Sequence, residues 1–315
     1  MKTISILIPT YNEEENVLAM VETLTRMFET ELSDYDHEIV FIDNASKDKT
    51  REKILMACNK DPKVRGVFNA KNFGQFNSPY YGLQQTTGDC TVLLCADFQD
   101  PVEMIPRFVA EWEDGHKIVC GIKTTSRENG FMYFMRSCYY KVIRKLSDVE
   151  QIEHFTGFGL YDKSFINTLR EVKDCTPFLR GMVAEFGAHR KDIPYEQARR
   201  RAGKTSNNWY TLYDAAMLSF TSYTKRGLRA AVFLGFGMSI LSMLVALVYV
   251  VLKLVWWYDM PLGSLPILIG VWVVGSIQLF FIGLLGEYIM NINTRVMNRP
   301  LVIEEARVNF EEKEK

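Results

Sequence analysis

The distribution of apolar residues divides this chain into two parts. Up to about residue 225, apolar residues come in short runs separated by polar turns, whereas two long apolar segments follow at about 230–252 and 265–289. Each long segment approaches the ~20 apolar residues that a helix needs to cross a bilayer. Only a short turn around Pro261 separates them, so the pattern predicts a transmembrane hairpin over residues 226–295.

The short runs in the first part alternate with stretches of helical periodicity. In the stretch 14–28, for example, apolar residues recur every 3–4 positions, which is typical of an amphipathic helix. The predicted strands are 4–8, 38–42, 64–68, 91–96 and 117–121, and the predicted helices are 14–28, 48–58, 78–85 and one that begins at Pro101. This alternation predicts an α/β domain over residues 1–225 with a mostly parallel sheet. Ligands of such sheets bind beyond the carboxyl ends of the strands.

Charged residues indicate how the hairpin is oriented. The basic residues that flank the two apolar segments on their outer sides are Lys225, Arg226, Arg229, Arg295 and Arg299. By the positive-inside rule, we expect both chain ends in the cytoplasm and the protein in the cytoplasmic membrane with two spans. Residues 296–315 would then form a cytosolic tail, whose charged end from Glu304 onward we expect to be frayed.

A basic amphipathic stretch at 131–146 has two interpretations. Its apolar residues share one arc of a helical wheel, and Arg136, Lys141, Arg144 and Lys145 occupy the other. Such a helix can lie in the interface of an anionic membrane. The alternative is an ordinary surface helix that packs on the sheet.

Composition excludes some classes of protein. A net charge of -1 provides no overall field that would attract nucleic acid. The six cysteines have no CxxC spacing, so we interpret them as reduced thiols of a cytosolic domain. The first residues lack the long apolar region of a signal peptide, and we therefore expect the N-terminal domain to stay in the cytosol.

Polar clusters follow three of the predicted strands, at residues 9–14, 43–48 and 97–101. A single Asp in a turn is usually a cap, but clusters at successive strand ends are more specific. An acidic residue at a strand end can accept hydrogen bonds from a base or a ribose. The oxygen ligands of Asp97 and Gln99 suit Mg²⁺ or Mn²⁺, which would bridge a diphosphate.

With these clusters the chain resembles the family 2 glycosyltransferases of the GT-A fold. More narrowly, it resembles the polyprenyl-phosphate glycosyltransferases, which include dolichyl-phosphate mannose synthases and bacterial undecaprenyl-phosphate glucosyltransferases. The matching stretches, which span nearly the whole chain, are Ile8–Glu14, Asp43–Asp48, Asn72–Gln75, Ala96–Pro101, Arg201–Thr205, and Gly286–Tyr288 leading to Arg299–Pro300. The last of these is typical of the two-span bacterial branch.

The resemblance implies roles for individual residues. The residues that would line the nucleotide pocket are Pro9, Tyr11, Glu13 and Asp43. Asp97 and Gln99 would hold the divalent metal on the donor diphosphate, with Asp100 as a further ligand.

Basic residues would approach the phosphates of the donor or the acceptor. Arg200 or Arg201, with Lys204, is implied for this role, and Arg127 is a weaker candidate for the acceptor phosphate. The alternative for the basic run 199–201 is a solvated or lipid-facing patch.

The sequence departs from the family pattern at two places. Cys95 stands where the family's metal motif usually begins with Asp. The stretch Thr156–Leu160 lacks the Asp and Arg that many relatives carry in that region. The nearby residues that could compensate for the missing acid are Glu153, His154, Asp162 and Glu185.

The implied reaction is an inverting transfer of one sugar from a nucleotide-sugar to undecaprenyl phosphate. UDP-glucose is the expected donor, and another UDP-sugar or GDP-mannose is an alternative. A processive polysaccharide synthase is disfavoured because the sequence lacks a Gln-x-x-Arg-Trp signature and further spans. A membrane scaffold without activity is favoured only by Cys95. Assembly of several copies through the hairpin stays open.

Overall fold

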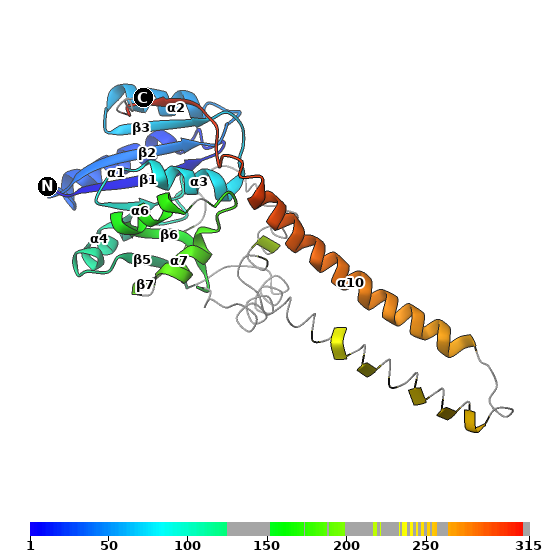
Figure 1. Cartoon of the computed structure of the whole chain (residues 1–315). Helices are drawn as coiled ribbons and strands as arrows, with labels where there is room; N and C mark the ends of the chain where they lie inside the picture. Colours follow the sequence, from blue (N-terminus) through cyan, green and yellow to red (C-terminus); the bar gives the residue numbers. More distant parts are fainter. Residues whose placement is uncertain are drawn as a thin grey trace.

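The computed structural model describes residues 1–124, 152–172, 174–187, 189–198 and 264–310, with isolated positions between 217 and 256. Its described strands form one sheet in the order β7-β5-β6-β4-β1-β2-β3-β8 (Figure 1). The strands are β1 (Thr3–Thr10), β2 (Asp36–Asp43), β3 (Val64–Asn69), β4 (Cys90–Leu93), β5 (Ile118–Lys123), β6 (Phe155–Asp162), β7 (Arg190–Tyr195) and β8 (Glu304–Val308). The helices are α1 (Val17–Thr30), α2 (Thr50–Lys60), α3 (Gly74–Gln85), the short 3₁₀ helix Val102–Met104, α4 (Ile105–Glu113), α6 (Lys163–Glu171), α7 (Leu179–Phe186) and α10 (Ser264–Val296).

The predicted α/β fold with a mostly parallel sheet is confirmed. β1 pairs in parallel with both β2 and β4, β2 pairs in parallel with β3, and β5 pairs in parallel with β7. The antiparallel strands are β6, which lies between β4 and β5, and β8, which covers the edge of β3. Sequence analysis did not predict these two strands or β7.

Helices cover both faces of the sheet, and the central strands are therefore buried on both sides. Ile4, Ile6 and Ile8 of β1 pack in the core beneath α1, α2 and α4. Leu7 points to the opposite face, where it packs in a core with residues of α3, α6 and α7. Burial on both faces explains why β1 and β2 read as continuous apolar runs rather than as alternating patterns.

The order of the strands creates a switch point beside β1. The chain runs from β1 outward through β2 to β3, and β4 then returns to the other side of β1. In open α/β sheets, the loops that leave neighbouring strands at such a point diverge and leave room for a ligand. The loops after β1 and β4 are those that carry the first and third predicted polar clusters.

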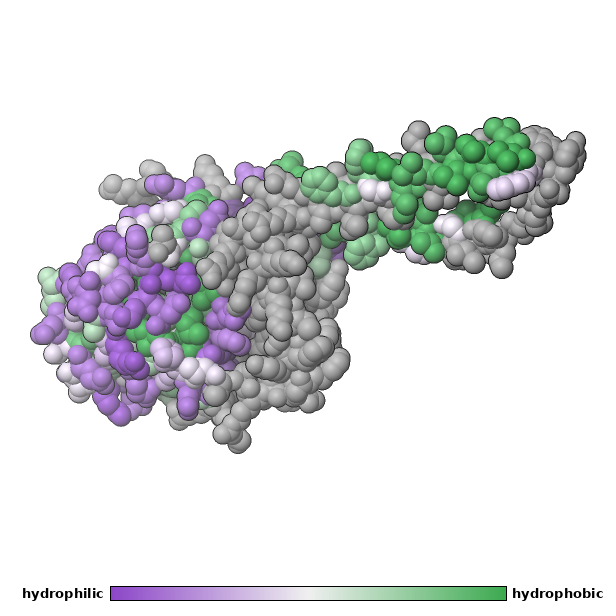
Figure 2. All heavy atoms as spheres, turned by 90° about the horizontal axis from the view of Figure 1, so that it is seen from below, coloured by the Kyte–Doolittle hydropathy of each residue, from purple (hydrophilic) through white to green (hydrophobic). Residues whose placement is uncertain are grey.

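Helix α10 extends away from the sheet domain (Figure 1). Its 33 residues give a length of about 50 Å at 1.5 Å per residue. Among the described residues, one helical segment, Val273–Val296, is long and apolar enough to cross a membrane. Figure 2 shows hydrophobic residues along α10 and mainly hydrophilic ones on the domain. The first predicted span, 230–252, lies mostly outside the described residues, and so does the amphipathic stretch 131–146.

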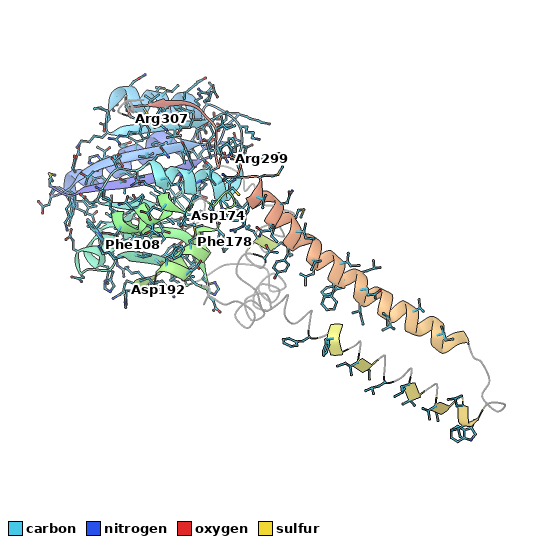
Figure 3. All side chains as sticks on the ribbon, viewed as in Figure 1. Phe108, Asp174, Phe178, Asp192, Arg299 and Arg307 are labelled. Atoms are coloured by element: carbon cyan, nitrogen blue, oxygen red, sulfur yellow. The ribbon has the colours of Figure 1, made fainter. Side chains whose placement is uncertain are left out.

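An ion pair and a hydrogen bond connect the sheet domain to the C-terminal end of α10. Arg295 forms an ion pair with Asp174 at 3.3 Å, and the thiol of Cys175 donates to the carbonyl of Thr294 at 3.3 Å. Figure 3 shows Asp174 and Phe178 beside this end of the helix. After α10 the chain returns to the sheet as β8. The expectation that the tail frays from Glu304 is therefore wrong for residues 304–308, because β3 offers an open edge with which they pair.

The carboxylate of Asp162 ties α6 and α4 together at the end of β6. Its Oδ2 accepts from Trp112 Nε1 at 2.9 Å, and its Oδ1 accepts from the backbone N–H of Ser164 at 2.9 Å and from Lys117 Nζ at 3.2 Å. Burial alone would raise the pKa of Asp162. The hydrogen bonds from Ser164, Trp112 and Lys117 outweigh it and lower that pKa to about 2.

We predict that Asp162→Asn lowers the free energy of unfolding at neutral pH by about 2 kcal/mol, since the shift from 3.8 is worth ~1.4 kcal/mol per pKa unit. The stabilisation is present above the unfolded pKa and is lost as the pH falls toward 2. The difference between variant and wild type should shrink to roughly half by pH 3. Denaturant unfolding at pH 6 and pH 3 measures it, and equal differences at both values would contradict the assignment.

Candidate active site

The loops after β1 and β2 are fastened to each other at the carboxyl edge of the sheet. Asn12 and Ala45 both adopt left-handed backbone conformations, with φ of 57° and 59°. The Asn12 N–H donates to Ser46 Oγ at 2.8 Å, and the Lys47 N–H donates back to Asn12 Oδ1 at 2.8 Å. This reciprocal pair fixes the first two polar clusters as one unit.

Asp43 lies at the end of β2 within this unit, and it is only 2% exposed. The hydroxyl of Ser46 donates to its Oδ1 at 2.5 Å, and the N–H of Ser46 donates to Oδ2 at 3.2 Å. Burial raises the pKa of Asp43, although the two bonds from Ser46 oppose the shift. The carboxylate is therefore held in place by its neighbours before any ligand arrives.

The other residues predicted for the nucleotide pocket lie on the same edge. Pro9 is in the last part of β1, and Tyr11 follows it; both are half-buried. Glu13 is buried, and its Oε2 accepts from Asn16 Nδ2 at 2.6 Å, at the start of α1. The structure thus brings Pro9, Tyr11 and Asp43 to one edge, while the Glu13 carboxylate contacts the residue that precedes α1.

The third cluster follows β4 in a tight loop. Phe98 has a φ of 57°, and the N–H of Gln99 donates to Asp97 Oδ1 at 3.1 Å. Asp100 is 2% exposed, and its Oδ1 accepts the hydroxyl of Tyr195 at 2.6 Å. Burial raises the pKa of Asp100, and the bond from Tyr195 opposes this shift. β4 ends at Leu93, earlier than predicted, so Cys95 belongs to the loop, where it is exposed.

The oxygen atoms of this loop fit a divalent metal that the substrate helps to coordinate. Among the described residues, no cluster of three or more His, Cys, Asp or Glu side chains could hold a metal by itself. Mg²⁺ is often bound by one or two carboxylates, with substrate phosphates and water completing its shell. Asp97 and Gln99 supply that kind of incomplete set. Ligation by Asp100, whose carboxylate binds Tyr195, stays a prediction.

A lysine near the loop after β4 was not predicted from the sequence. Lys123 ends β5, and the charges of Asp100 and Asp97 act on it, as does that of Arg180 in α7. Burial lowers the pKa of Lys123, and the two carboxylates oppose the shift. The predicted strand stopped at residue 121, whereas β5 continues to Lys123, so the sequence did not mark this lysine as the residue at a strand end.

Several predicted residues are not placed at the carboxyl edge. Arg127, Arg200, Arg201 and Lys204 lie outside the described residues, so their roles stay predictions. Asp162 cannot replace the missing acid of the family pattern. β6 is antiparallel to β4, and Asp162 pairs with Cys90 at the opposite end of the sheet.

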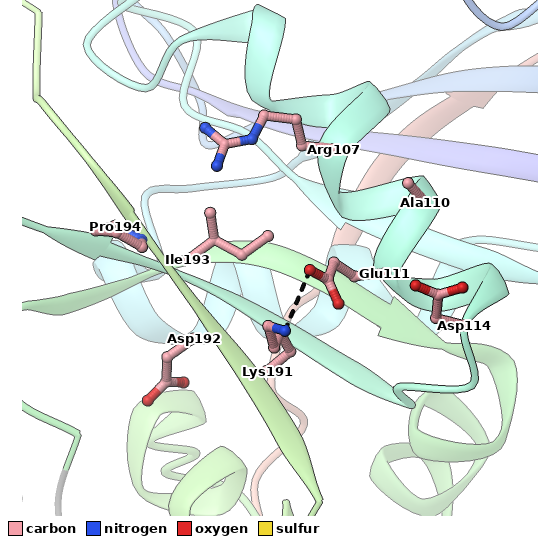
Figure 4. A pocket seen from close by; sticks show the side chains of 8 residues that line it. All are labelled: Arg107, Ala110, Glu111, Asp114, Lys191, Asp192, Ile193 and Pro194. Carbon is pink, nitrogen blue, oxygen red and sulfur yellow. Dashed lines mark ion pairs between the residues drawn. The ribbon is translucent and has the colours of Figure 1, made fainter.

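Two surface depressions adjoin α4. One of about 330 Å³ lies between α4 and β7, and the ion pair between Lys191 and Glu111, at 3.3 Å, crosses it (Figure 4). A second of about 540 Å³ adjoins it and also contacts Arg107 and Pro194. The second is also lined by Pro101 and by Tyr195, the partner of Asp100, so it borders the loop after β4.

Comparison with known proteins agrees with this geometry. The family described as glycosyl transferase family 2 matches residues 5–187, which is more than half of the chain. The chain belongs to glycosyl transferase family 2. It is accordingly a glycosyltransferase, and Asp43 and Asp97 lie within the matched region.

Relatives of this family 2 glycosyltransferase extend over nearly its whole length. A prophage-derived bactoprenol glucosyl transferase of Shigella flexneri is 30% identical over 95% of this chain and 96% of its own. A prophage bactoprenol glucosyl transferase homolog of Escherichia coli is 29% identical over 95% of this chain and 97% of its own. Among solved structures, mannosyl-3-phosphoglycerate synthase from Rubrobacter xylanophilus is 15% identical over 69% of this chain and 71% of its own, with a TM-score of 0.48.

We predict that Tyr195→Phe destabilises the family 2 domain by about 1.5–3 kcal/mol at neutral pH, because it removes a hydrogen bond to a buried charged group. The loss should diminish as the pH falls, because burial raises the pKa of Asp100 and protonation turns the bond into one between neutral groups. Thermal unfolding at pH 7.5 and pH 4.5 measures this. Tyr35→Phe is the matched control, since the Tyr35 hydroxyl donates to the exposed Glu113. An unchanged melting temperature for Tyr195→Phe would contradict the role of the pair.

Proposed function

We propose that this protein transfers a single glucose from UDP-glucose to undecaprenyl phosphate at the cytoplasmic face of the membrane, with inversion at the anomeric carbon. The main support for this proposal is the position of Asp43 at the end of β2 and of Asp97 in the loop after β4. These two strands lie on either side of β1, at the switch point of the sheet. This is where an α/β sheet binds its ligand. Another UDP-sugar or GDP-mannose is the alternative donor.

The direction of the sheet supports a lipid acceptor. The N-terminus, where β1 begins, lies at the side of the domain away from α10, so β1 runs toward the side from which α10 leaves (Figure 1). The carboxyl edge consequently faces the apolar helix. A phosphate at the surface of a bilayer crossed by α10 would meet the same edge as the nucleotide-sugar.

The relatives support the same acceptor and sugar. The Shigella flexneri protein is by its name a bactoprenol glucosyl transferase, and it matches this chain along α10 as well as along the sheet domain, since 95% of the chain is covered. We propose that the first apolar segment, at 230–252, completes a two-span hairpin with α10 and that both ends of the chain are cytoplasmic. The basic residues Arg295 and Arg299 at the end of α10 support this orientation.

The described residues would bind and orient the donor. Asp43 and the loop that holds it would accept hydrogen bonds from the nucleoside, and Asp97 with Gln99 would hold Mg²⁺ or Mn²⁺. When bound, the metal would neutralise charge on the diphosphate. Lys123 at the end of β5 interacts with the charges of Asp97 and Asp100, and it would add positive charge near the leaving group.

The reaction needs no strong base. A phosphate monoester has a second pKa of about 6, so the acceptor is mostly ionised at neutral pH. One of its oxygens attacks the anomeric carbon and forms the new C–O bond. The bond to the nucleoside diphosphate breaks, and the leaving group takes the electron pair. A single displacement of this kind inverts the anomeric configuration, and the enzyme contributes orientation and charge stabilisation.

The decisive experiment is transfer of radiolabel from a panel of nucleotide-sugars to undecaprenyl phosphate in detergent, with Mg²⁺ or Mn²⁺ and with EDTA. We expect one labelled lipid product, from UDP-glucose, that disappears with EDTA. Label transferred only from GDP-mannose would correct the donor. Nucleotide binding without transfer from any donor would instead favour the inactive scaffold.

We predict that Asp97→Ala lowers the transfer rate by at least about 100-fold with an unchanged melting temperature, because it removes the main candidate carboxylate for the metal. Asp114→Ala, at an exposed position after α4, is the matched control and should transfer at the wild-type rate. Normal turnover by the Asp97 variant would overturn the metal assignment.

A further inference from the structure

The returning strand β8 is bound to the sheet by side chains as well as by its backbone. Glu304 accepts the hydroxyl of Tyr81 at 2.9 Å and the side chain of Arg307 at 2.8 Å. Asn309 Nδ2 donates to the carbonyls of Cys58 and Val64, each at 2.8 Å. β8 is therefore fixed to α3, to α2 and to the start of β3.

The contact of this returning segment with the end of β3 lies beside the candidate site. Glu304 pairs with Asn69, the last residue of β3, after an irregularity in the register. The N–H of the next residue, Ala70, donates to the carbonyl of Ile303 at 2.9 Å. The chain that leaves α10 thus sets the position of the strand end at Asn69.

Asn69 in turn holds Asn44, the neighbour of Asp43. Asn69 is 2% exposed, and its Nδ2 donates to Asn44 Oδ1 at 3.1 Å and to Ser78 Oγ at 3.0 Å. The N–H of Asn44 donates to the carbonyl of Thr10 at 2.9 Å. The side chain of Asn69 and the backbone N–H of Asn44 together link the ends of β1, β2 and β3.

Asn44 also fixes the loop that enters α3. Its Oδ1 accepts the N–H of Phe73 at 2.9 Å, and its Nδ2 donates to Asn72 Oδ1 at 3.0 Å and to the carbonyl of Gly74 at 3.2 Å. Both the oxygen and the nitrogen of this side chain are engaged by Asn69 and by the 72–74 loop. A residue of this kind acts on a ligand through the loops that it holds.

We propose that Asn44 is a positioning residue for the nucleotide part of the donor, and that β8 braces it through Asn69. This inference rests on the proposed function, because it assigns the Asp43 edge to the nucleotide. The chain beyond α10 then contributes to donor binding without touching the donor. If β8 only covered the edge of β3, its loss would lower stability and leave the affinity for nucleotide unchanged.

Titration of the full-length protein with UDP and UDP-glucose, alongside transfer kinetics, tests the role of Asn44. Asn44→Ala should weaken nucleotide binding by about tenfold, because the 72–74 loop must then be ordered by the ligand. The KM for the donor should rise with it, while the KM for undecaprenyl phosphate and kcat change less than about threefold. Asn59→Ala, at an exposed position of α2, is the matched control and should bind like the wild type. A variant that melts earlier but binds nucleotide normally would overturn the proposal.

Two truncations test the brace. A chain that ends at Phe310 keeps β8 and should bind UDP like the wild type, whereas one that ends at Ile303 should bind more weakly. If the shorter chain does not fold, Tyr81→Phe combined with Glu304→Gln keeps the backbone and loosens the same strand. Wild-type affinity in that double variant would overturn the brace. Failure of the wild type to bind any nucleotide would instead reject the proposed function.

Discussion

The parallel pairing of β1 with both β2 and β4 is the constraint on which the rest of the molecule depends. Because β1, β2 and β4 run in the same direction, the loops that follow them all leave the sheet at its carboxyl edge. The backbone hydrogen bonds of the sheet set the spacing between these loops, and the loops have little freedom of their own. Asn12 binds both Ser46 and Lys47, and Asn44 binds the loop after β3. Three polar clusters that are far apart in sequence thereby become one surface.

Buried carboxylates at the two ends of the strands have pKa shifts of opposite sign. Asp162, at the edge away from α10, has its pKa lowered by its donors, so its ionised form stabilises the fold above acidic pH. Asp43 and Asp100, at the candidate site, have raised pKa values because burial outweighs their hydrogen bonds. Their ionisation therefore costs stability as the pH rises above the usual range of a carboxyl group. Asp43 and Asp100 thus lie at the edge where a cation or hydrogen-bond donors of a nucleoside would compensate their charge.

The sequence was sufficient for the central strands, the helices between them and the polar clusters, because uninterrupted apolar runs and a 3–4 residue period are strong signals. It was insufficient for β8. Glu304 and Arg307 are charged residues in a short segment, and only the open edge of β3, more than 200 residues earlier, makes them a strand. Lys123 was missed for a related reason, since its neighbours Asp97 and Asp100 come from another strand end. Local pattern predicts an element well, whereas pairing across the sheet has no local signature.

The place of β8 in the chain has a consequence for how the protein is made. While the ribosome is translating α10, β3 has already been synthesised, but its partner strand has not. During that interval the sheet exposes an edge, and such edges pair readily with other chains. The sheet can therefore be completed only after α10 has been synthesised. Chains whose translation stops within α10 would keep this edge open and would be prone to pair with one another.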